Sequence, residues 1–137
     1  MSADAAPTAF FNKTYDETLG LLVEMRDYVA HVQPRERAAL APGTDARFAC
    51  EALRVTARLT QIMAWLLAQK AVHAGEMSTE EVATRHSPLA EIEICMAHAA
   101  EAELRLLPDR FLDLLDRSRR LYVRVARLDG MVRGRLH

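Results

Sequence analysis

The sequence predicts an all-α protein: an antiparallel bundle of three long helices that forms a homodimer. Residues 48–66 and 107–132 carry apolar residues at alternating steps of four and three, the spacing of a helical seam that packs on other helices. No stretch shows the sustained alternation of apolar and polar residues that predicts a strand. Half of the 137 residues are hydrophobic, enough to fill one core, so we expect a single domain.

The first long helix is predicted over residues 14–33. Thr14 and Glu17 match the capping-box pattern at a helix start. Residues 1–9 are small and polar and include Pro7, so we expect them to be disordered and the helical-bundle domain to cover residues 10–135. The expected inner face of this helix comprises Tyr15, Leu19, Leu22, Met25, Val29 and Val32.

The second long helix is predicted over residues 46–74, after a turn at residues 41–45. Its seam reads Phe48, Ala52, Val55, Leu59, Ile62 and Leu66. Between residues 62 and 74 the helix becomes apolar on nearly every side, and such a helix must be covered on all sides. A chain of this length can hardly supply that cover, so we expect this stretch to complete its burial against a twin or a partner.

Trp65 is the expected anchor of that interface. It continues the stripe of the helix that begins with the polar residues Arg47 and Glu51, on the side opposite the seam. A tryptophan with a polar rim is typical of a binding hot spot. The predicted interface comprises Trp65, Arg58, Gln61, Ala68, Gln69 and Val72. The alternative is that Trp65 belongs to the core.

The remainder of the chain predicts one short and one long helix. Ser78 and Glu81 form a second capping box, which starts a short helix that ends near His86. Residues 89–106 are expected to be partly helical. Pro108 suits the first turn of the third long helix, predicted over residues 108–132. Its seam reads Leu107, Phe111, Leu114, Ser118, Leu121, Val125, Leu128 and Val132.

Charge is distributed unevenly along the chain. Residues 76–103 hold seven acids and one base, and residues 117–135 hold seven arginines and one acid. These segments either complement each other, within the fold or across a dimer, or form two solvated faces. The net charge of −1 gives no global basic field for nucleic acid. A small DNA-binding regulator that uses the arginines of the third helix is nevertheless the alternative function.

The sequence gives no pattern of catalytic or metal-binding residues. Cys50, His73, Cys95 and His98 are the candidate metal ligands, but they do not form the two closely spaced pairs of a structural zinc site. Nucleophile-elbow and phosphate-loop motifs are absent as well. We therefore expect no enzyme activity, metal or cofactor, and we expect Cys50 and Cys95 to be free thiols in the interior.

Localisation follows from two further absences. The chain contains no apolar run of about 18 residues, which a membrane-spanning helix needs. Its first residues lack the basic and apolar regions of a secretory signal. We expect a cytoplasmic protein without membrane insertion.

Three segments of the sequence resemble the alphaproteobacterial family of the regulator of CtrA degradation (RcdA). They are FFNKTYDETLGLLVEMRDYVA at residues 10–30, RLTQIMAWLLAQKAVHAGEMSTEE at residues 58–81, and LPDRFLDLLDRSRRLYVRVARLD at residues 107–129. They occur in the order that the family shows, and the middle segment is the most specific.

The resemblance implies a homodimeric, mainly three-helix adaptor protein. It implies assistance to the ClpXP protease in destroying cell-cycle regulators such as CtrA. The implied partners are the ClpX unfoldase, the response-regulator-type protein CpdR and the regulator that is degraded, and the implied location is the cell pole.

Overall fold

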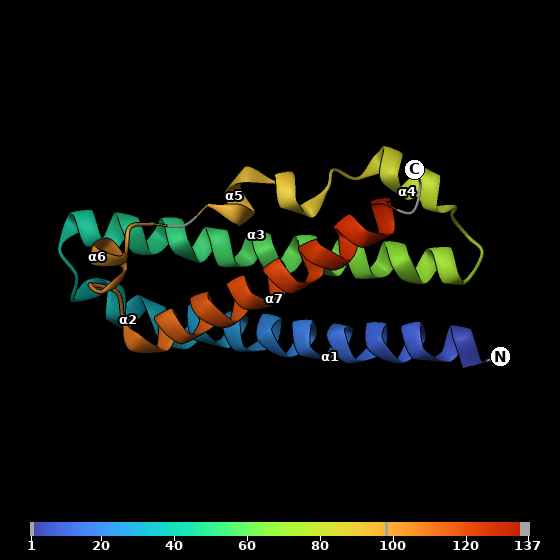
Figure 1. Cartoon of the computed structure of the whole chain (residues 1–137). Coiled ribbons are helices and arrows are strands. Elements are labelled where there is room, and N and C mark those ends of the chain that lie inside the picture. Colours follow the sequence, from blue (N-terminus) through green and yellow to red (C-terminus); the bar gives the residue numbers. More distant parts are fainter. Residues whose placement is uncertain (1, 98, 135–137) are drawn as a thin grey trace.

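The computed structural model describes residues 2–97 and 99–134, with side chains from residue 9 onward, and it confirms the predicted all-α class. No strand occurs in these residues. Three long helices, α1 (Ser2–His31), α3 (Pro42–His73) and α7 (Asp109–Gly134), contact one another in pairs (Figure 1). The shorter elements are α2 (Gln33–Ala38), α4 (Thr79–Arg85), the 3-10 helix η1 (Leu89–Glu91), α5 (Glu93–Met96) and α6 (Glu101–Leu104). None of the helices in this part of the chain is long and apolar enough to cross a membrane.

The antiparallel arrangement predicted for all three helices is wrong for α3 and α7, which run in the same direction. Phe48 packs on Phe111 near the start of both helices, and Trp65 bonds to Asp129 near their ends. The reason is the connecting segment, residues 75–108, which returns along the length of the molecule before α7 begins (Figure 1). Helix α1 runs opposite to α3, because Phe11 contacts Trp65 while Tyr28 lies beside Phe48.

Helix α1 starts earlier than the sequence predicted. It begins at Ser2, whereas we expected disorder through residue 9 and a helix start at residue 14. Thr14 lies within the helix and accepts a 2.7 Å hydrogen bond from the Thr18 hydroxyl through its carbonyl oxygen, so it is no cap. Four alanines among residues 2–9 favour the helix, and the Phe11 ring fixes the following turn against Trp65.

The buried face of α1 also differs from the predicted one. It consists of Phe11, Thr14, Thr18, Leu21, Met25 and Tyr28, again with steps of three and four. Leu19 and Val29, which we expected inside, are 43% and 42% exposed. The pattern was misjudged because two threonines occupy core positions, and Thr18 satisfies its hydroxyl within the helix.

The predicted seams of α3 and α7 are confirmed. All six residues of the α3 seam are buried, and so are the first six residues of the α7 seam, from Leu107 to Val125. The rings of Phe48 and Phe111 lie 4.8 Å apart and Tyr28 packs against both, which joins the three long helices at one end. The common core therefore follows the predicted spacing of α3 and α7.

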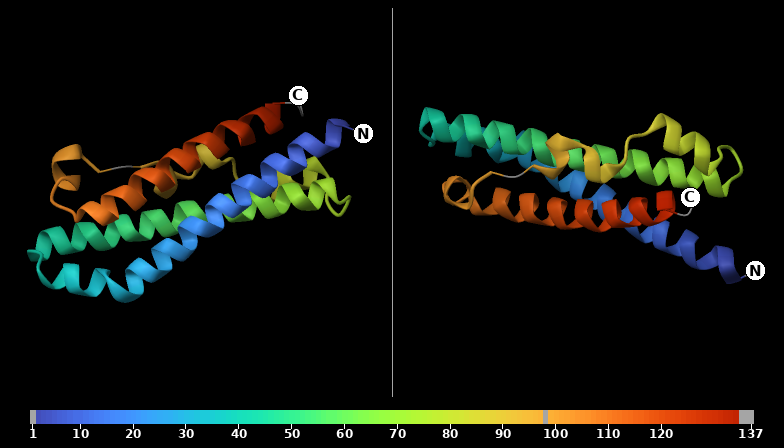
Figure 2. Two further views of the ribbon diagram at one scale, coloured as in Figure 1. Left: turned by 90° about the horizontal axis from the view of Figure 1, so that it is seen from below. Right: turned by 45° about the horizontal axis from the view of Figure 1, so that its top comes forward.

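The connecting segment covers a face of α3 and α7 that the long helices leave open (Figure 2). Its α4 starts with the predicted capping box, in which Ser78 and Glu81 exchange hydrogen bonds. Residues 89–97 and 99–106 are partly helical as predicted, with η1, α5 and α6 as short helices and Ile92 and Ala97 extended. Buried side chains of this segment, including Val82, Leu89 and Cys95, extend the core outward.

Leu121→Ala is expected to lower the free energy of unfolding by about 2–5 kcal/mol, because a buried leucine side chain is replaced by a cavity. Leu121 is 1% exposed in the middle of α7. Leu106→Ala is the matched control, since Leu106 is 64% exposed, and it should change the free energy by less than about 0.5 kcal/mol. Urea unfolding followed by circular dichroism measures both. Equal effects of the two substitutions would show that the α7 seam is misplaced.

Candidate functional site

The predicted interface around Trp65 is largely buried inside the chain. Arg58, Trp65, Ala68 and Gln69 are 1%, 5%, 7% and 5% exposed, and Gln61 and Val72 are half-buried. The prediction of an open partner surface there is therefore wrong. Its premise was that one short chain cannot cover α3 on all sides, whereas α1, α7 and the connecting segment cover the side that carries Trp65, although Leu67 is 54% exposed on another side. The alternative that Trp65 belongs to the core is correct.

A buried carboxylate holds this face of the molecule together. Asp129 is 3% exposed and accepts a 3.0 Å hydrogen bond from Trp65 Nε1 and a 2.9 Å bond from the backbone N–H of Leu89. Arg133, one turn later on α7, donates from Nε to both carboxylate oxygens at 3.0 Å. A buried charge needs a partner and several hydrogen bonds, and Asp129 has both. It thereby joins α3, α7 and η1.

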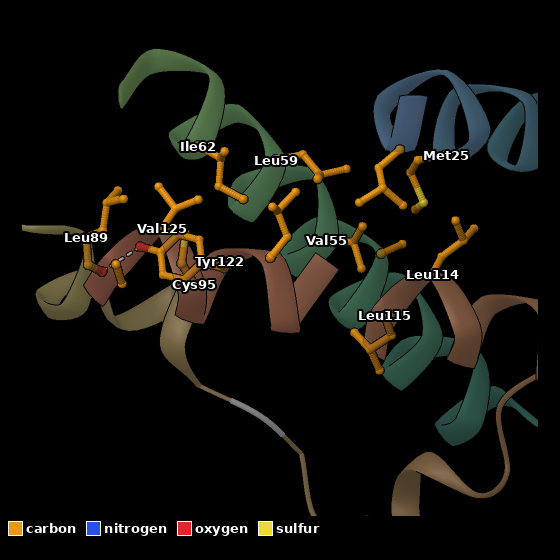
Figure 3. Packing of buried hydrophobic residues seen from close by; sticks show 14 of the residues in the cluster. Met25, Val55, Leu59, Ile62, Leu89, Cys95, Leu114, Leu115, Tyr122 and Val125 are labelled. Carbon is orange, nitrogen blue, oxygen red and sulfur yellow. Dashed lines mark hydrogen bonds between the residues drawn. The ribbon is translucent and has the colours of Figure 1, made fainter. Parts of the chain in front are cut away.

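Arg133 and Tyr122 of α7 extend these contacts to the backbone of the connecting segment. Arg133 Nη2 donates to the His86 carbonyl at 2.8 Å, just after α4 ends. The Tyr122 hydroxyl donates to the Leu89 carbonyl (Figure 3). Burial is the main cause that raises the pKa of Tyr122, so its hydroxyl stays protonated and available as the donor. The side chains of α7 thus bind backbone groups of the connecting segment: the His86 carbonyl, and the Leu89 carbonyl, which also accepts the N–H of Ile92.

Two arginines of α3 hold the next part of the segment. Arg58 donates from Nε to the Cys95 carbonyl at 2.8 Å and from Nη2 to the Ala97 carbonyl at 3.1 Å. Arg54 Nε donates to the Ile94 carbonyl at 3.1 Å. These carbonyls lie at the end of α5, where a short helix leaves its acceptors unpaired and where a cation is favoured. Burial, the largest cause, lowers the pKa of Arg58.

Cys50, His73 and Cys95, three of the candidate metal ligands, do not form part of a metal site among the described residues. Cys95 is buried, and that burial raises the pKa of its thiol. Cys50 is exposed, so the prediction of an interior thiol is wrong for this residue, although both cysteines are free. Across residues 2–97 and 99–134, no three His, Cys, Asp or Glu side chains form a group that would hold a metal ion. His98 lies outside the described residues.

The arginines of α7 pair mainly with α1 and with their own helix. Arg117 binds Glu24 at 2.6 Å, and Arg124 binds Glu17 at 2.5 Å. Arg120 pairs with Asp116 one turn before it. Of the two alternatives for the charged stretches, pairing of residues 117–134 with the acids of residues 76–103 is not found among the described residues of one chain. The basic stretch pairs instead with α1, which lies antiparallel to α7 along the same length.

The fold and its buried polar cluster define an all-α protein whose charged interior groups bind its own backbone. The chain belongs to the family described as a protein of unknown function, DUF1465, whose model matches residues 2–137. It is also similar to a solved structure, RcdA from Caulobacter crescentus CB15, with 34% sequence identity and a TM-score of 0.66. That match covers 89% of each chain, which confirms the resemblance to the RcdA family. A comparison with curated proteins gave no match.

Asp129→Asn is expected to lower the free energy of unfolding by about 2–4 kcal/mol, because Arg133 loses its buried partner and an amide cannot accept all the hydrogen bonds. Asp113→Asn is the matched control, since this acid is also on α7 but is largely exposed beside Arg117. The control should change the free energy by less than about 1 kcal/mol. Urea unfolding compares the two. If both variants lose the same small amount, Asp129 does not hold the segment in place.

Proposed function

We propose that this protein is a non-enzymatic adaptor that assists ClpXP-dependent proteolysis of cell-cycle transcription regulators such as CtrA. The observation that carries the proposal is the 34% identity to RcdA over 89% of both chains. The match covers most of both chains, and the model of the family of unknown function matches residues 2–137 of this one.

The geometry supports a role in protein contact. The buried ionisable groups Asp129, Arg58 and Tyr122 are all bonded to the chain's own backbone or side chains, and so they serve the fold. We propose that the functional contacts lie on the outer surfaces of the helices. An adaptor works through such outer surfaces, which bind the ClpX unfoldase, a CpdR-type response regulator and the regulator to be degraded. We place this protein in the cytoplasm, with recruitment to the cell pole.

The ion pairs of α7 weigh against the alternative of a DNA-binding regulator. Among the arginines of residues 117–134, Arg117, Arg120, Arg124 and Arg133 each form an ion pair with a carboxylate of this chain. Nucleic-acid binding gains affinity when arginines neutralise phosphates and so release the counterions that were bound there. An arginine that is already paired with a carboxylate of the chain is less available for this. Arg119 and Arg127 remain, which is a small basic surface for DNA.

We also propose that the protein forms a homodimer, now on a different surface from the one around Trp65. Leu19 and Val23 lie one turn apart on α1 and are 43% and 39% exposed. On α3, Leu53 and Leu67 are 66% and 54% exposed. Large apolar side chains on the outer faces of two adjacent helices favour association with a second copy.

Sedimentation equilibrium at micromolar concentration is expected to give twice the chain mass of 15.4 kDa. Leu19→Ser with Val23→Ser should shift the protein toward the monomer while the circular dichroism spectrum stays helical. Leu106→Ser, which removes an exposed leucine from the connecting segment, is the control. A monomer of the unaltered protein at high concentration would contradict the dimer.

The adaptor function is tested by reconstituted proteolysis. Purified ClpXP, the CpdR-type partner and CtrA are incubated with and without this protein, and the remaining CtrA is followed on gels. We expect the protein to accelerate the loss of CtrA, and to have no effect when ClpX is omitted. An unchanged rate with CtrA and with other cell-cycle regulators would contradict the proposal.

A further inference from the structure

Residues 86–97, here called the strap, cross from one long helix to another, because η1 packs on α7 and α5 packs on α3. Of the strap residues, only Leu89 and Cys95 are buried, and both lie beside Tyr122 of α7 (Figure 3). The strap therefore has a small apolar anchor compared with the three long helices, and a segment with few buried apolar side chains opens more readily than the core.

The strap is held mainly through its backbone. Four side chains of α3 and α7 donate to its carbonyl oxygens, at residues 86, 89, 94, 95 and 97, and a carboxylate accepts the N–H of Leu89. These five side chains, here called the strap seat, are Arg54, Arg58, Tyr122, Asp129 and Arg133. Every polypeptide carries the same backbone groups, so the strap seat offers hydrogen bonds to any segment that follows the same path. Sequence enters mainly through the apolar position that Leu89 fills.

One member of the strap seat is left incompletely satisfied when the strap is in place. Arg58 donates from Nε and Nη2 to strap carbonyls, but its Nη1 is buried and has no hydrogen-bond partner. A buried donor without a partner has lost its water and gained nothing in return. Opening of the strap returns this nitrogen to water, which favours the open state.

We propose that the strap opens while the long helices stay packed, and that the exposed strap seat binds a short segment of another polypeptide with a leucine-sized side chain in the place of Leu89. The strap is then an intramolecular occupant that competes with this ligand. The site is additional to the outer surfaces proposed above. In an adaptor the ligand would belong to a partner protein, and that role rests on the proposed function, whereas opening and peptide binding do not.

Opening is tested by thiol labelling of the Cys50→Ser variant, whose only cysteine is Cys95. Cys95 is 1% exposed, so its reaction with dithionitrobenzoic acid requires that the strap opens. We expect labelling at least about tenfold faster than the global unfolding equilibrium allows, with little dependence on urea at low concentrations. Labelling that follows global unfolding, in its rate and in its steep dependence on urea, would overturn the proposal.

Binding is tested on the labelled protein, because the bulky adduct at Cys95 keeps the strap from returning to its seat. Fluorescence anisotropy follows a fluorescein-tagged peptide of residues 86–97 that carries Cys95→Ser. The matched control peptide has N-methyl-leucine at position 89 and so lacks the N–H that Asp129 accepts. We expect the first peptide to bind, and the methylated peptide to bind at least about tenfold more weakly, since one hydrogen bond to a charged group is lost.

The unlabelled protein should also bind the first peptide at least about tenfold more weakly than the labelled protein, because its own strap competes. Circular dichroism checks that the labelled protein keeps its helices. The proposal is overturned by absent binding, by equal binding of the two peptides, by equal binding to the labelled and unlabelled proteins, or by loss of the helical spectrum on labelling.

Discussion

The fold depends on the buried carboxylate of Asp129. The connecting segment contains only short helices, whose ends leave many backbone groups in need of partners from elsewhere. Asp129 accepts the backbone N–H of Leu89 and, on the same carboxylate, the indole N–H of Trp65 and the guanidinium of Arg133. One side chain thereby fixes the segment relative to α3 and α7. Arg54 and Arg58 repeat the principle at the end of α5, where they donate to carbonyls.

The path of the connecting segment explains why α7 runs parallel to α3 and why the expected interface around Trp65 is buried. Since the chain returns along the molecule before α7 begins, α3 and α7 run parallel, and the returning segment lies over the side of α3 that carries Trp65. When one face of a helix changes from polar to apolar along its length, the apolar part is expected to pack against another element or another molecule. Here the cover comes from the same chain, and the dimer contact that we propose uses instead the outer faces of α1 and α3, where large apolar side chains are exposed.

The sequence predicted the parts of the structure that depend on local spacing. The seams of α3 and α7 and the Ser78 capping box follow from helical geometry and apolar periodicity, and the structure has them. The buried face of α1 was missed because Thr14 and Thr18 fill core positions that hydrophobicity alone does not mark. The partners of Trp65 and Arg58 were missed because each bond joins residues 37 or more positions apart. One signal was available: Asp129 directly follows Leu128 of the α7 seam. An acid so close to the core indicates a buried polar cluster.

Native-state hydrogen exchange of the Asp129→Asn variant tests most directly whether this carboxylate fastens the connecting segment. Protection factors of backbone amides are compared with those of the unaltered protein. The account predicts that amides of residues 86–96, Leu89 above all, lose protection by local opening, while amides at the centre of α1 and α3 change only with global stability. Unchanged protection of residues 86–96, or an equal loss across all helices, would contradict it.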